Sequence, residues 1–383
     1  MNITNDIKYI GVNDKKIDLF EGQYKVPGGI SYNSYIIFDE KLAVVDSVDK
    51  DFGNKWLENI ETELGQKHPD YLIVQHMEPD HSANIMTFSE RYPDAVIVSS
   101  AKAFPMMKNF FGTDFADRRL IVGEGDSLCL GNHTLTFLTA PMVHWPEVIV
   151  TYDEKEKVLF SADAFGKFGA LDIDEDWADE ARRYYIGIVG KYGVQVQALL
   201  EKASKLDIQK ILPLHGPVLE ENLGYYIDLY DKWSKYIPEE KGVLIAYTSI
   251  YGNTKKAAVK LYENLIASGV KATIYDLARD DFFAAIGDAF RFDKIVLATT
   301  TYNGDMFPDM RKFIFGLIER GFKNRKVAFI ENGSWGPVAA RKMKTMFESS
   351  EGIEFTENNV KILSSLSDDS KNQLENLKNE LLK

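Results

Sequence analysis

Two histidines, a glutamate and an aspartate fall within the stretch HMEPDH, which occupies positions 76–81. Imidazole nitrogens and carboxylate oxygens are side-chain atoms that commonly bind transition metals. The stretch follows the apolar run YLIVQ at 71–75, which predicts a short buried strand. It precedes SANIMTFSERYP at 82–93, which has the spacing of a helix. The first hypothesis is therefore a metal site at the junction between a strand and a helix.

These four side chains are not expected to bind one ion together. In an extended segment, residues two apart project to the same side, so His76 and Glu78 are predicted to share one metal. Asp80 and His81 then face another side and are predicted to share a second metal. A pair of metals about 3.5–4 Å apart needs further ligands to complete both coordination shells. Other segments of the chain must therefore contribute.

Three further candidates follow apolar runs elsewhere in the sequence. His144 lies in APMVHWPE, Asp163 ends the run VLFSAD, and His215 follows IQKILPL. A carboxylate has two oxygens, so Asp163 is well suited to bridge two cations. The chain has six histidines, and four of them occupy such positions. The other two, His68 and His133, precede predicted strands and are interpreted as surface residues.

The elements that would position these residues follow two different patterns. The N-terminal part begins with strands, including a predicted hairpin at 31–47, and then mixes strands with helices; the segment 177–205 is predicted to be mostly helical. The polar stretch IPEEKG at 237–242 contains a proline and marks the predicted boundary between domains 1–240 and 241–383. Beyond it, five apolar strands alternate with amphipathic helices, which predicts a doubly wound parallel sheet.

The first strand of the C-terminal part is followed by TSIYGNT at 248–254 and then by a helix. Its hydroxyl groups, inward-turned backbone N–H groups and helix N-terminus favour a phosphate. Two later loops at strand ends, 299–308 and 331–337, add aromatic residues that could stack on a planar ring. Each loop alone also fits an ordinary turn, but three together favour a ligand. The predicted contacts are Thr248, Ser249, Ile250, Tyr251, Gly252, Asn253, Thr254, Thr301, Tyr302, Asn303, Gly304, Asn332, Gly333, Ser334, Trp335 and Gly336.

The composition limits the classes of partner. A net charge of −13 argues against a nucleic-acid or anionic membrane surface. The N-terminus has no apolar signal segment, and no run of 18 apolar residues occurs, so we expect a soluble cytoplasmic protein. The single cysteine, Cys129, excludes an internal disulfide and a thiolate metal cluster. It lies in an apolar run and is interpreted as a small buried hydrophobic residue.

Each half of the chain resembles a known type of domain. Residues from about 242 to 383 resemble flavodoxin through TSIYGNT and the fivefold alternation of strand and helix, which implies FMN. The ligand series of the N-terminal half resembles the metallo-β-lactamase superfamily, in which a histidine usually stands at the position of Glu78 and the metal is usually zinc. A carboxylate at this position makes the site richer in oxygen and favours iron, although zinc accepts the same ligand types.

The two halves together resemble the flavodiiron proteins, and the resemblance covers essentially the whole chain. It implies an α/β fold, with an N-terminal metallo-β-lactamase-like αββα sandwich and a C-terminal flavodoxin-like doubly wound parallel sheet. It also implies FMN and a non-haem pair of irons that reduces oxygen to water or nitric oxide to nitrous oxide. Small departures are Glu147, where aspartate is expected, and Ile250, where methionine is common. The implied iron ligands are His76, Glu78, Asp80, His81, His144, Asp163 and His215, with Asp163 bridging.

The resemblance has further implications for partners. We expect no appended rubredoxin-like domain, because such a domain needs four cysteines, so an external donor such as a rubredoxin or a flavin reductase is implied. A head-to-tail homodimer, or a dimer of dimers, is also implied. A tyrosine of RRYY, Tyr184 or Tyr185, could donate a hydrogen bond to the substrate, and Tyr185 is the residue we select. The alternative is that both tyrosines only pack within a helix.

Two other functions stay open at this point. In the first, the chain is a zinc-dependent hydrolase of an ester or thioester, with a regulatory flavodoxin domain. In the second, it is an electron carrier whose N-terminal domain is only a scaffold. Glu78 separates iron from zinc chemistry, and the effect of replacing Asp163 separates an enzyme from a carrier. Oxygen and nitric oxide stay alternative substrates of the leading hypothesis.

Overall fold

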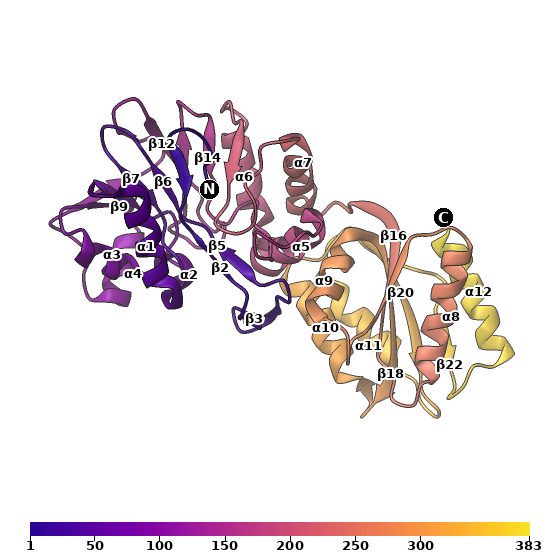
Figure 1. The fold of residues 1–383 in the computed structure, drawn as a ribbon. Helices are drawn as coiled ribbons and strands as arrows, with labels where there is room; N and C mark the ends of the chain where they lie inside the picture. Colours follow the sequence, from indigo (N-terminus) through magenta and orange to yellow (C-terminus); the bar gives the residue numbers. More distant parts are fainter. The chain divides into compact units, whose positions relative to one another are not determined.

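The computed structural model describes residues 1–383 and divides into two compact units, residues 1–231 and 232–383 (Figure 1). The division falls within helix α7 (Leu223–Ser234), before the boundary predicted at residue 240. The predicted domain limits, 1–240 and 241–383, stay a prediction. None of the helices combines the length and the apolar character that crossing a lipid bilayer requires.

Two facing sheets form the N-terminal unit. The first has the order β1 (Ile7–Tyr9), β6 (Tyr35–Ile37), β7 (Ala43–Val45), β8 (Tyr71–Ile73), β9 (Val96–Ser100) and β10 (Arg119–Val122). The second has the order β11 (Ser127–Cys129), β12 (Thr134–Thr139), β13 (Ile149–Asp153), β14 (Val158–Phe160) and β15 (Lys210–Leu212). Ile37 and Val45 of the first sheet share one core with Phe137 and Phe160 of the second, so apolar burial joins the two sheets. Two small ribbons complete the strands: β2 (Val12–Asp14) with β5 (Ile30–Tyr32), and β3 (Leu19–Phe20) with β4 (Tyr24–Lys25).

Helices cover the outer sides of this sandwich (Figure 1). Those beside the first sheet are α1 (Gly53–Leu64), α2 (Pro79–Ser82), α3 (Ile85–Arg91) and α4 (Ala103–Phe111). Those beside the second sheet are α5 (Trp177–Tyr184), α6 (Gly193–Ala203) and α7. The unit is therefore the αββα sandwich that the sequence predicts.

The prediction that residues 177–205 are mostly helical is confirmed, but the segment is not one continuous helix. The segment contains α5 and α6, separated by a π-helical turn at Tyr185–Val189 and a 3₁₀ turn at Gly190–Tyr192. The hydroxyl of Tyr24 donates a hydrogen bond of 2.8 Å to the carbonyl oxygen of Gly187 within the π-helical turn. The Tyr24 ring lies so close that a Cβ at Gly187 would come within 2.7 Å of it. Glycine at position 187 thus permits a close contact with Tyr24 that a larger side chain would prevent.

Strand direction explains how distant residues meet at one edge of the second sheet. β13 is antiparallel to both β12 and β14, and β15 is parallel to β14. β12, β14 and β15 therefore run in the same direction and end at the same edge. The loops that follow these three strands carry His144, Asp163 and His215.

The C-terminal unit is one parallel sheet between two layers of helices. Its strands have the order β17 (Ala272–Asp276), β16 (Glu240–Tyr247), β18 (Phe292–Tyr302), β20 (Arg325–Asn332) and β21 (Ile353–Phe355). This is the flavodoxin-like order 2-1-3-4-5. α8 (Asn253–Ala267) and α12 (Asp368–Leu381) cover one face (Figure 1). α9 (Phe282–Arg291), α10 (Pro308–Glu319) and α11 (Ala339–Met346) cover the other.

The fifth strand position of this sheet is divided between two short strands. β21 pairs with the beginning of β20, whereas β22 (Val360–Ile362) pairs with its end. The fivefold alternation in the sequence predicts a single last strand, within KILSS at 361–365, which overlaps β22 but not β21. A further short strand, β19 (Asp305–Met306), folds back antiparallel onto the end of β18.

Two interpretations of single residues are wrong. Cys129 is exposed, because β11 alternates between the two sides of the sheet and places this thiol on the outer side. His133 is fully buried rather than at the surface. Its Nδ1 lies 2.6 Å from Oδ2 of Asp153, and its Nε2 lies 3.4 Å from Oδ2 of Asp6. Two carboxylates thus compensate its burial.

Candidate metal centre and cofactor pocket

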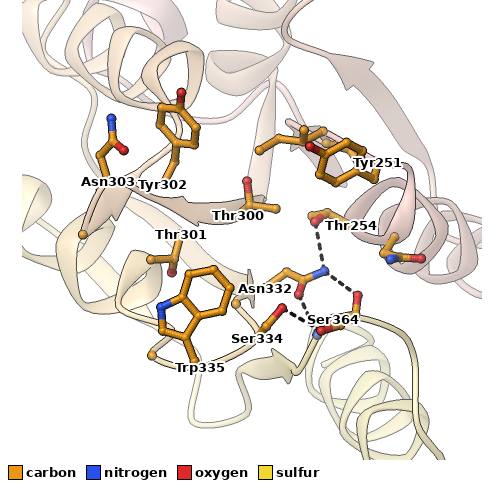
Figure 2. Close-up of a pocket in the computed structure, with 16 residues that line it drawn as sticks. Tyr251, Thr254, Thr300, Thr301, Tyr302, Asn303, Asn332, Ser334, Trp335 and Ser364 are labelled. Atoms are coloured by element: carbon orange, nitrogen blue, oxygen red, sulfur yellow. Dashed lines mark hydrogen bonds between the residues drawn. The ribbon is translucent and has the colours of Figure 1, made fainter.

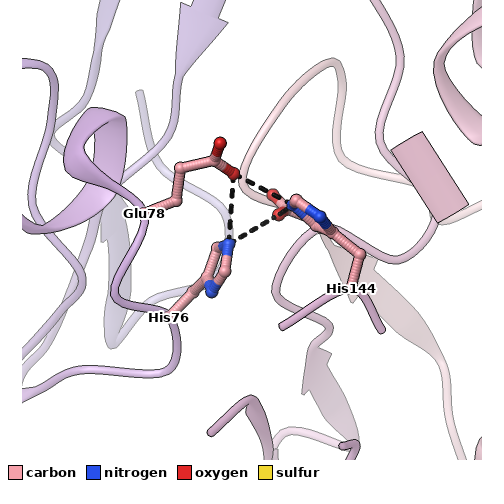
Figure 3. A group of neighbouring side chains, drawn as sticks. His76, Glu78 and His144 are labelled. Atoms are coloured by element: carbon pink, nitrogen blue, oxygen red, sulfur yellow. Dashed lines mark hydrogen bonds and ion pairs between the residues drawn. The ribbon is translucent and has the colours of Figure 1, made fainter. Parts of the chain in front are cut away.

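Four predicted ligands converge in the first of two groups. His76 follows β8, Glu78 is the residue before α2, His144 lies in the loop after β12, and Asp163 follows β14. Nε2 of His76 is 3.3 Å from Oε2 of Glu78 and 3.2 Å from Oδ2 of Asp163. Nε2 of His144 is 2.9 Å from the same Glu78 oxygen and 3.3 Å from the same Asp163 oxygen. Figure 3 shows His76, Glu78 and His144 pointing toward one another.

The other three predicted ligands form the second group. Asp80 and His81 lie on the short helix α2, and His215 follows β15. Nε2 of His81 and Nε2 of His215 are 3.0 Å apart, and each lies 3.3 Å from Oδ2 of Asp80. Two imidazole nitrogens at this distance need a proton or a cation between them, because two lone pairs repel.

Asp163 faces both groups at once. Its Oδ2 lies beside His76 and His144, whereas its Oδ1 lies 3.5 Å from Nε2 of His81 and 3.7 Å from Nε2 of His215. The side chain is 1% exposed, so water does not compete for these oxygens. One carboxylate therefore presents a separate oxygen to each of two adjacent ligand groups.

The residues present fit a pair of metal ions. Both oxygens of Asp80 and both oxygens of Asp163 are buried without a hydrogen-bond partner, as is Nδ1 of His81. Unsatisfied buried carboxylates are costly unless a cation compensates them. Metal–ligand bonds of about 2.0–2.2 Å at tetrahedral or octahedral angles place neighbouring donor atoms about 3.0–3.5 Å apart. Most of the distances above lie in or near this range.

Protonation supports the same assignment. Burial alone would lower the pKa of His76 and His144, but nearby carboxylates outweigh it. These are Asp163, Glu147 and Glu78 for His76, and Asp163 and Glu78 for His144. The pKa of His144 rises to about 9, and that of His76 rises well above its usual value. Burial alone would raise the pKa of Glu78 and Asp163, yet the adjacent histidines hold both well below their usual values. Without a metal, the cluster thus holds protons where a cation would bind.

Three aromatic rings pack against His215 of the second group. Phe20 of β3 and Tyr32 of β5 lie edge-on to His215, with ring centroids 5.4 and 5.9 Å away. Tyr184 also packs against His215, at 5.4 Å. Tyr185, the residue selected from the sequence, packs against Tyr230 at 5.0 Å, and its role stays a prediction. Of the two tyrosines, the structure brings Tyr184 against the ligand cluster.

The C-terminal unit has a cavity of about 560 Å³ at the carboxyl ends of its strands. This volume suits a ligand of nucleotide size, and the position is where doubly wound sheets bind ligands. Trp335 is 95% exposed and Tyr251 is 91% exposed, so each offers a free aromatic face. Figure 2 shows both with Tyr302 around the opening. The lining is Ser249, Ile250, Tyr251, Asn253, Thr254, Thr300, Thr301, Tyr302, Asn303, Gly304, Asn332, Gly333, Ser334, Trp335, Gly336 and Ser364.

Two predicted contacts do not line this cavity. Thr248 is buried beneath it and shares a hydrogen bond of 2.6 Å with Thr299. Gly252 caps the N-terminus of α8 with a φ of +89°, a backbone conformation that favours glycine. The predicted contacts leave out two residues of the lining, Thr300 and Ser364. The backbone carbonyl oxygen of Ser364 accepts a hydrogen bond of 3.0 Å from the Asn332 amide. The loop after β22 carried no aromatic or glycine signal that could have revealed it.

The residues present fit a flavin mononucleotide. The hydroxyls of Ser249 and Thr254 and the N-terminus of α8 form a cradle for a phosphate. The exposed rings of Tyr251 and Trp335 are able to cover the two faces of a planar ring system. A lysine for a triphosphate is absent from the loop, which agrees with a single phosphate.

Comparisons with known proteins agree with this architecture. A family model described as ODP family beta lactamase matches residues 30–216. An uncharacterized protein of Methanocaldococcus jannaschii is 31% identical over 91% of this chain and 89% of its own length. A nitric oxide reductase of Moorella thermoacetica is 30% identical over 87% of this chain and 86% of its own length.

Solved structures share the whole fold. Rubredoxin oxygen:oxidoreductase from Desulfovibrio gigas superposes with a TM-score of 0.91 and 22% identity, over 100% of this chain and 97% of that one. The flavodiiron protein from Giardia intestinalis superposes with a TM-score of 0.90 and 24% identity, over 99% and 95%.

Fold and site together define a class: a lactamase-like metal-binding unit joined to a flavodoxin-like unit. The chain belongs to the flavodiiron protein family and is an oxidoreductase. The two alternatives, a zinc hydrolase and a passive electron carrier, are therefore less favoured than an oxidoreductase.

Proposed function

We propose that this chain reduces nitric oxide to nitrous oxide, or oxygen to water, with electrons that pass through FMN to two iron ions. The cavity of the C-terminal unit would hold FMN, and the two ligand groups of the N-terminal unit would hold the irons. The observation that carries the proposal is the position of Asp163, which presents one oxygen to each group. A shared carboxylate would hold two cations side by side, where together they could serve the four-electron reduction of one oxygen molecule or the two-electron coupling of two nitric oxide molecules.

Iron suits the donor set better than zinc. Three carboxylates, Glu78, Asp80 and Asp163, stand among four imidazoles. Oxygen-rich ligands stabilise the higher oxidation state of a redox metal, whereas zinc has no redox chemistry. Glu78 in particular supplies an oxygen to the first group, 2.9 Å from His144.

The chain's own residues control access and protons around the cluster. When bound, the iron pair supplies electrons and open coordination positions, and FMN supplies electrons one at a time. Phe20 and Tyr32 form an apolar wall beside His215 that limits entry of water. Burial raises the pKa of Tyr184 well above its usual value, so this phenol keeps its proton at neutral pH. Its position beside His215 supports a role as a hydrogen-bond donor to bound substrate.

The relatives guide the choice of substrate and donor. The Moorella thermoacetica relative, at 30% identity, is named nitric oxide reductase, so nitric oxide is the first substrate to assay. The Desulfovibrio gigas protein is named rubredoxin oxygen:oxidoreductase, which supports oxygen as the second substrate and a rubredoxin as the external donor. A flavin reductase is the alternative donor.

A direct assay tests the proposal. The purified chain is loaded with ferrous iron and FMN, reduced without oxygen, and mixed with nitric oxide or oxygen. We expect two irons and one FMN per chain and rapid consumption of at least one of the two gases. Consumption of neither gas by the loaded protein would contradict the proposal, as would a tightly bound zinc pair that iron does not displace.

We also propose a head-to-tail homodimer, or a dimer of such dimers, as the active form, which would bring the FMN of one subunit beside the irons of the other. Sedimentation of the loaded protein tests this directly. A fully active monomer would contradict it without affecting the proposed reaction.

A further inference from the structure

A buried carboxylate lies directly behind one ligand of the first group. Oε1 of Glu147 lies 2.9 Å from Nδ1 of His76 and accepts a second hydrogen bond, also of 2.9 Å, from the backbone N–H of Met77. The side chains of Glu147 and His76 are both 0% exposed. Because the carboxylate accepts from Nδ1, the other nitrogen, Nε2, is the one turned toward Glu78 and Asp163.

The second group has no equivalent of this carboxylate. Nδ1 of His215 donates a hydrogen bond of 2.7 Å to the backbone carbonyl oxygen of Ser31, which is a neutral acceptor. Nδ1 of His81 is buried and has no hydrogen-bond partner. Among the groups that accept from the outer nitrogens of these rings, only the acceptor of His76 carries a charge.

The side chain of Glu147 is not the only contact that holds its segment. Its backbone carbonyl oxygen accepts a hydrogen bond of 2.7 Å from the hydroxyl of Ser100, which fixes the loop independently of the side chain. Its Oε2 is buried without a hydrogen-bond partner, so the carboxylate is incompletely satisfied. A glutamine of the same shape would still accept from His76 at a lower cost of burial.

We infer that Glu147 is a positioning residue that makes the two metal positions unequal. The position bounded by His76, Glu78 and His144 holds its ion more tightly than the position bounded by Asp80, His81 and His215. A carboxylate that accepts from the outer nitrogen of a metal-binding histidine fixes its tautomer and raises its basicity as a ligand. The inference rests on the proposed function only in requiring that the cluster binds two ions, whatever the substrate.

Titration of the metal-free, full-length chain with Co²⁺ tests this inference, because Co²⁺ reports its coordination through visible absorption. We expect the unchanged protein to bind two equivalents in two separate steps. Glu147→Gln should weaken the tighter step by about 10–100-fold, the usual effect of losing such a partner, and leave the weaker step unchanged. The matched control is Ser100→Ala, which alters the same loop but leaves the carboxylate in place, and it should keep both steps.

A second pair of variants tests the inequality without changing Glu147. His215→Ala removes a ligand of the second group and His76→Ala removes one of the first, so each variant leaves one group intact. The ion that remains in His215→Ala should be bound more tightly than the ion that remains in His76→Ala. Equal affinities in this pair, or an equal effect of Glu147→Gln on both steps, would overturn the inference. Failure of the unchanged protein to bind two ions would instead contradict the proposed function.

Discussion

The ligand cluster and the flavin cavity differ in burial and in the forces that would bind their ligands. The cluster is buried, and its carboxylates already lie beside its histidines before any metal binds. Asp163, for example, is 1% exposed and faces both groups. The cavity is open, and its largest groups, Trp335 and Tyr251, are almost fully exposed. Binding at the cluster replaces protons by cations, whereas binding at the cavity covers apolar rings. The first site should therefore respond to charge and pH, and the second to the loss of aromatic area.

The largest expected effect comes from Asp163→Asn, which breaks only the cluster. The amide keeps the shape of the side chain but cannot offer a negative oxygen to both groups. We expect bound iron and gas reduction to fall by more than about 100-fold, beyond the usual effect of removing a residue that only supports a ligand. FMN binding, measured by fluorescence quenching, should be unchanged. Retention of both irons by this variant would show that the cluster does not depend on a shared carboxylate.

The second-largest effect should be a loss of stability at high pH in the metal-free protein, confined to the N-terminal unit. A group with a raised pKa in the folded state stabilises it below the unfolded pKa, and this stabilisation disappears as the pH rises through the folded pKa. For His144 this window runs from about 6.5 to about 9, and the shift corresponds to stability of the order of 3 kcal/mol.

Hydrogen exchange of the metal-free chain at pH 6.5 and pH 9, corrected for intrinsic rates, measures this loss. Residues around the cluster should lose protection as the pH rises, whereas residues 232–383, which contain no histidine, should not. Metal-loaded protein is the control and should lose little, because its imidazoles are already neutral ligands. Equal losses in both units would contradict the pKa assignment.

Trp335→Ala should weaken the binding of FMN in the cavity and leave the metal cluster unchanged. Loss of an aromatic face from a stacked ring system is worth about 1.4 kcal/mol, which corresponds to a tenfold rise in the Kd for FMN. Trp335→Phe keeps a ring and should lose less. The iron content of both variants should equal that of the unchanged protein. A normal Kd in the alanine variant would show that Trp335 does not contact the flavin.

The smallest expected effect distinguishes two adjacent tyrosines. Tyr184→Phe removes one hydroxyl beside His215 and should lower the turnover number about fivefold, which corresponds to one hydrogen bond of about 1 kcal/mol. Its iron and FMN contents should not change. Tyr185→Phe, the matched control from the neighbouring position, should have the smaller effect. The opposite order would favour Tyr185, the residue selected from the sequence.

The sequence was most informative where apolar strands end. His144, Asp163 and His215 could be selected because each follows a run of apolar residues, and the strands before them run in the same direction. The division of HMEPDH between two groups was also predicted, but from an extended geometry. In the structure, Asp80 and His81 lie on a helical turn instead and reach the second group through a different local conformation.

Other parts of the site had no usable signal in the sequence. Phe20 belongs to a strand of two residues, which is too short to show a period. Tyr32 lies in the predicted hairpin at 31–47, but nothing in that pattern indicated a contact with His215. Glu147 was noticed only as a departure from an expected aspartate, since its hydrogen bond to His76 depends on a tertiary contact between residues 71 positions apart. The same holds for Ser364, which reaches the cavity only because β22 pairs with the end of β20.

The common edge at which β12, β14 and β15 end has a further consequence, for how the chain holds together. Ions bound there would join four segments that are far apart along the chain, from His76 to His215, and would act as cross-links between the two sheets. Closing such long loops restricts the unfolded chain, and the entropy of closure grows only slowly with loop length. The two bound ions would therefore stabilise the fold as well as take part in the reaction. Their removal should lower the stability of both sheets together.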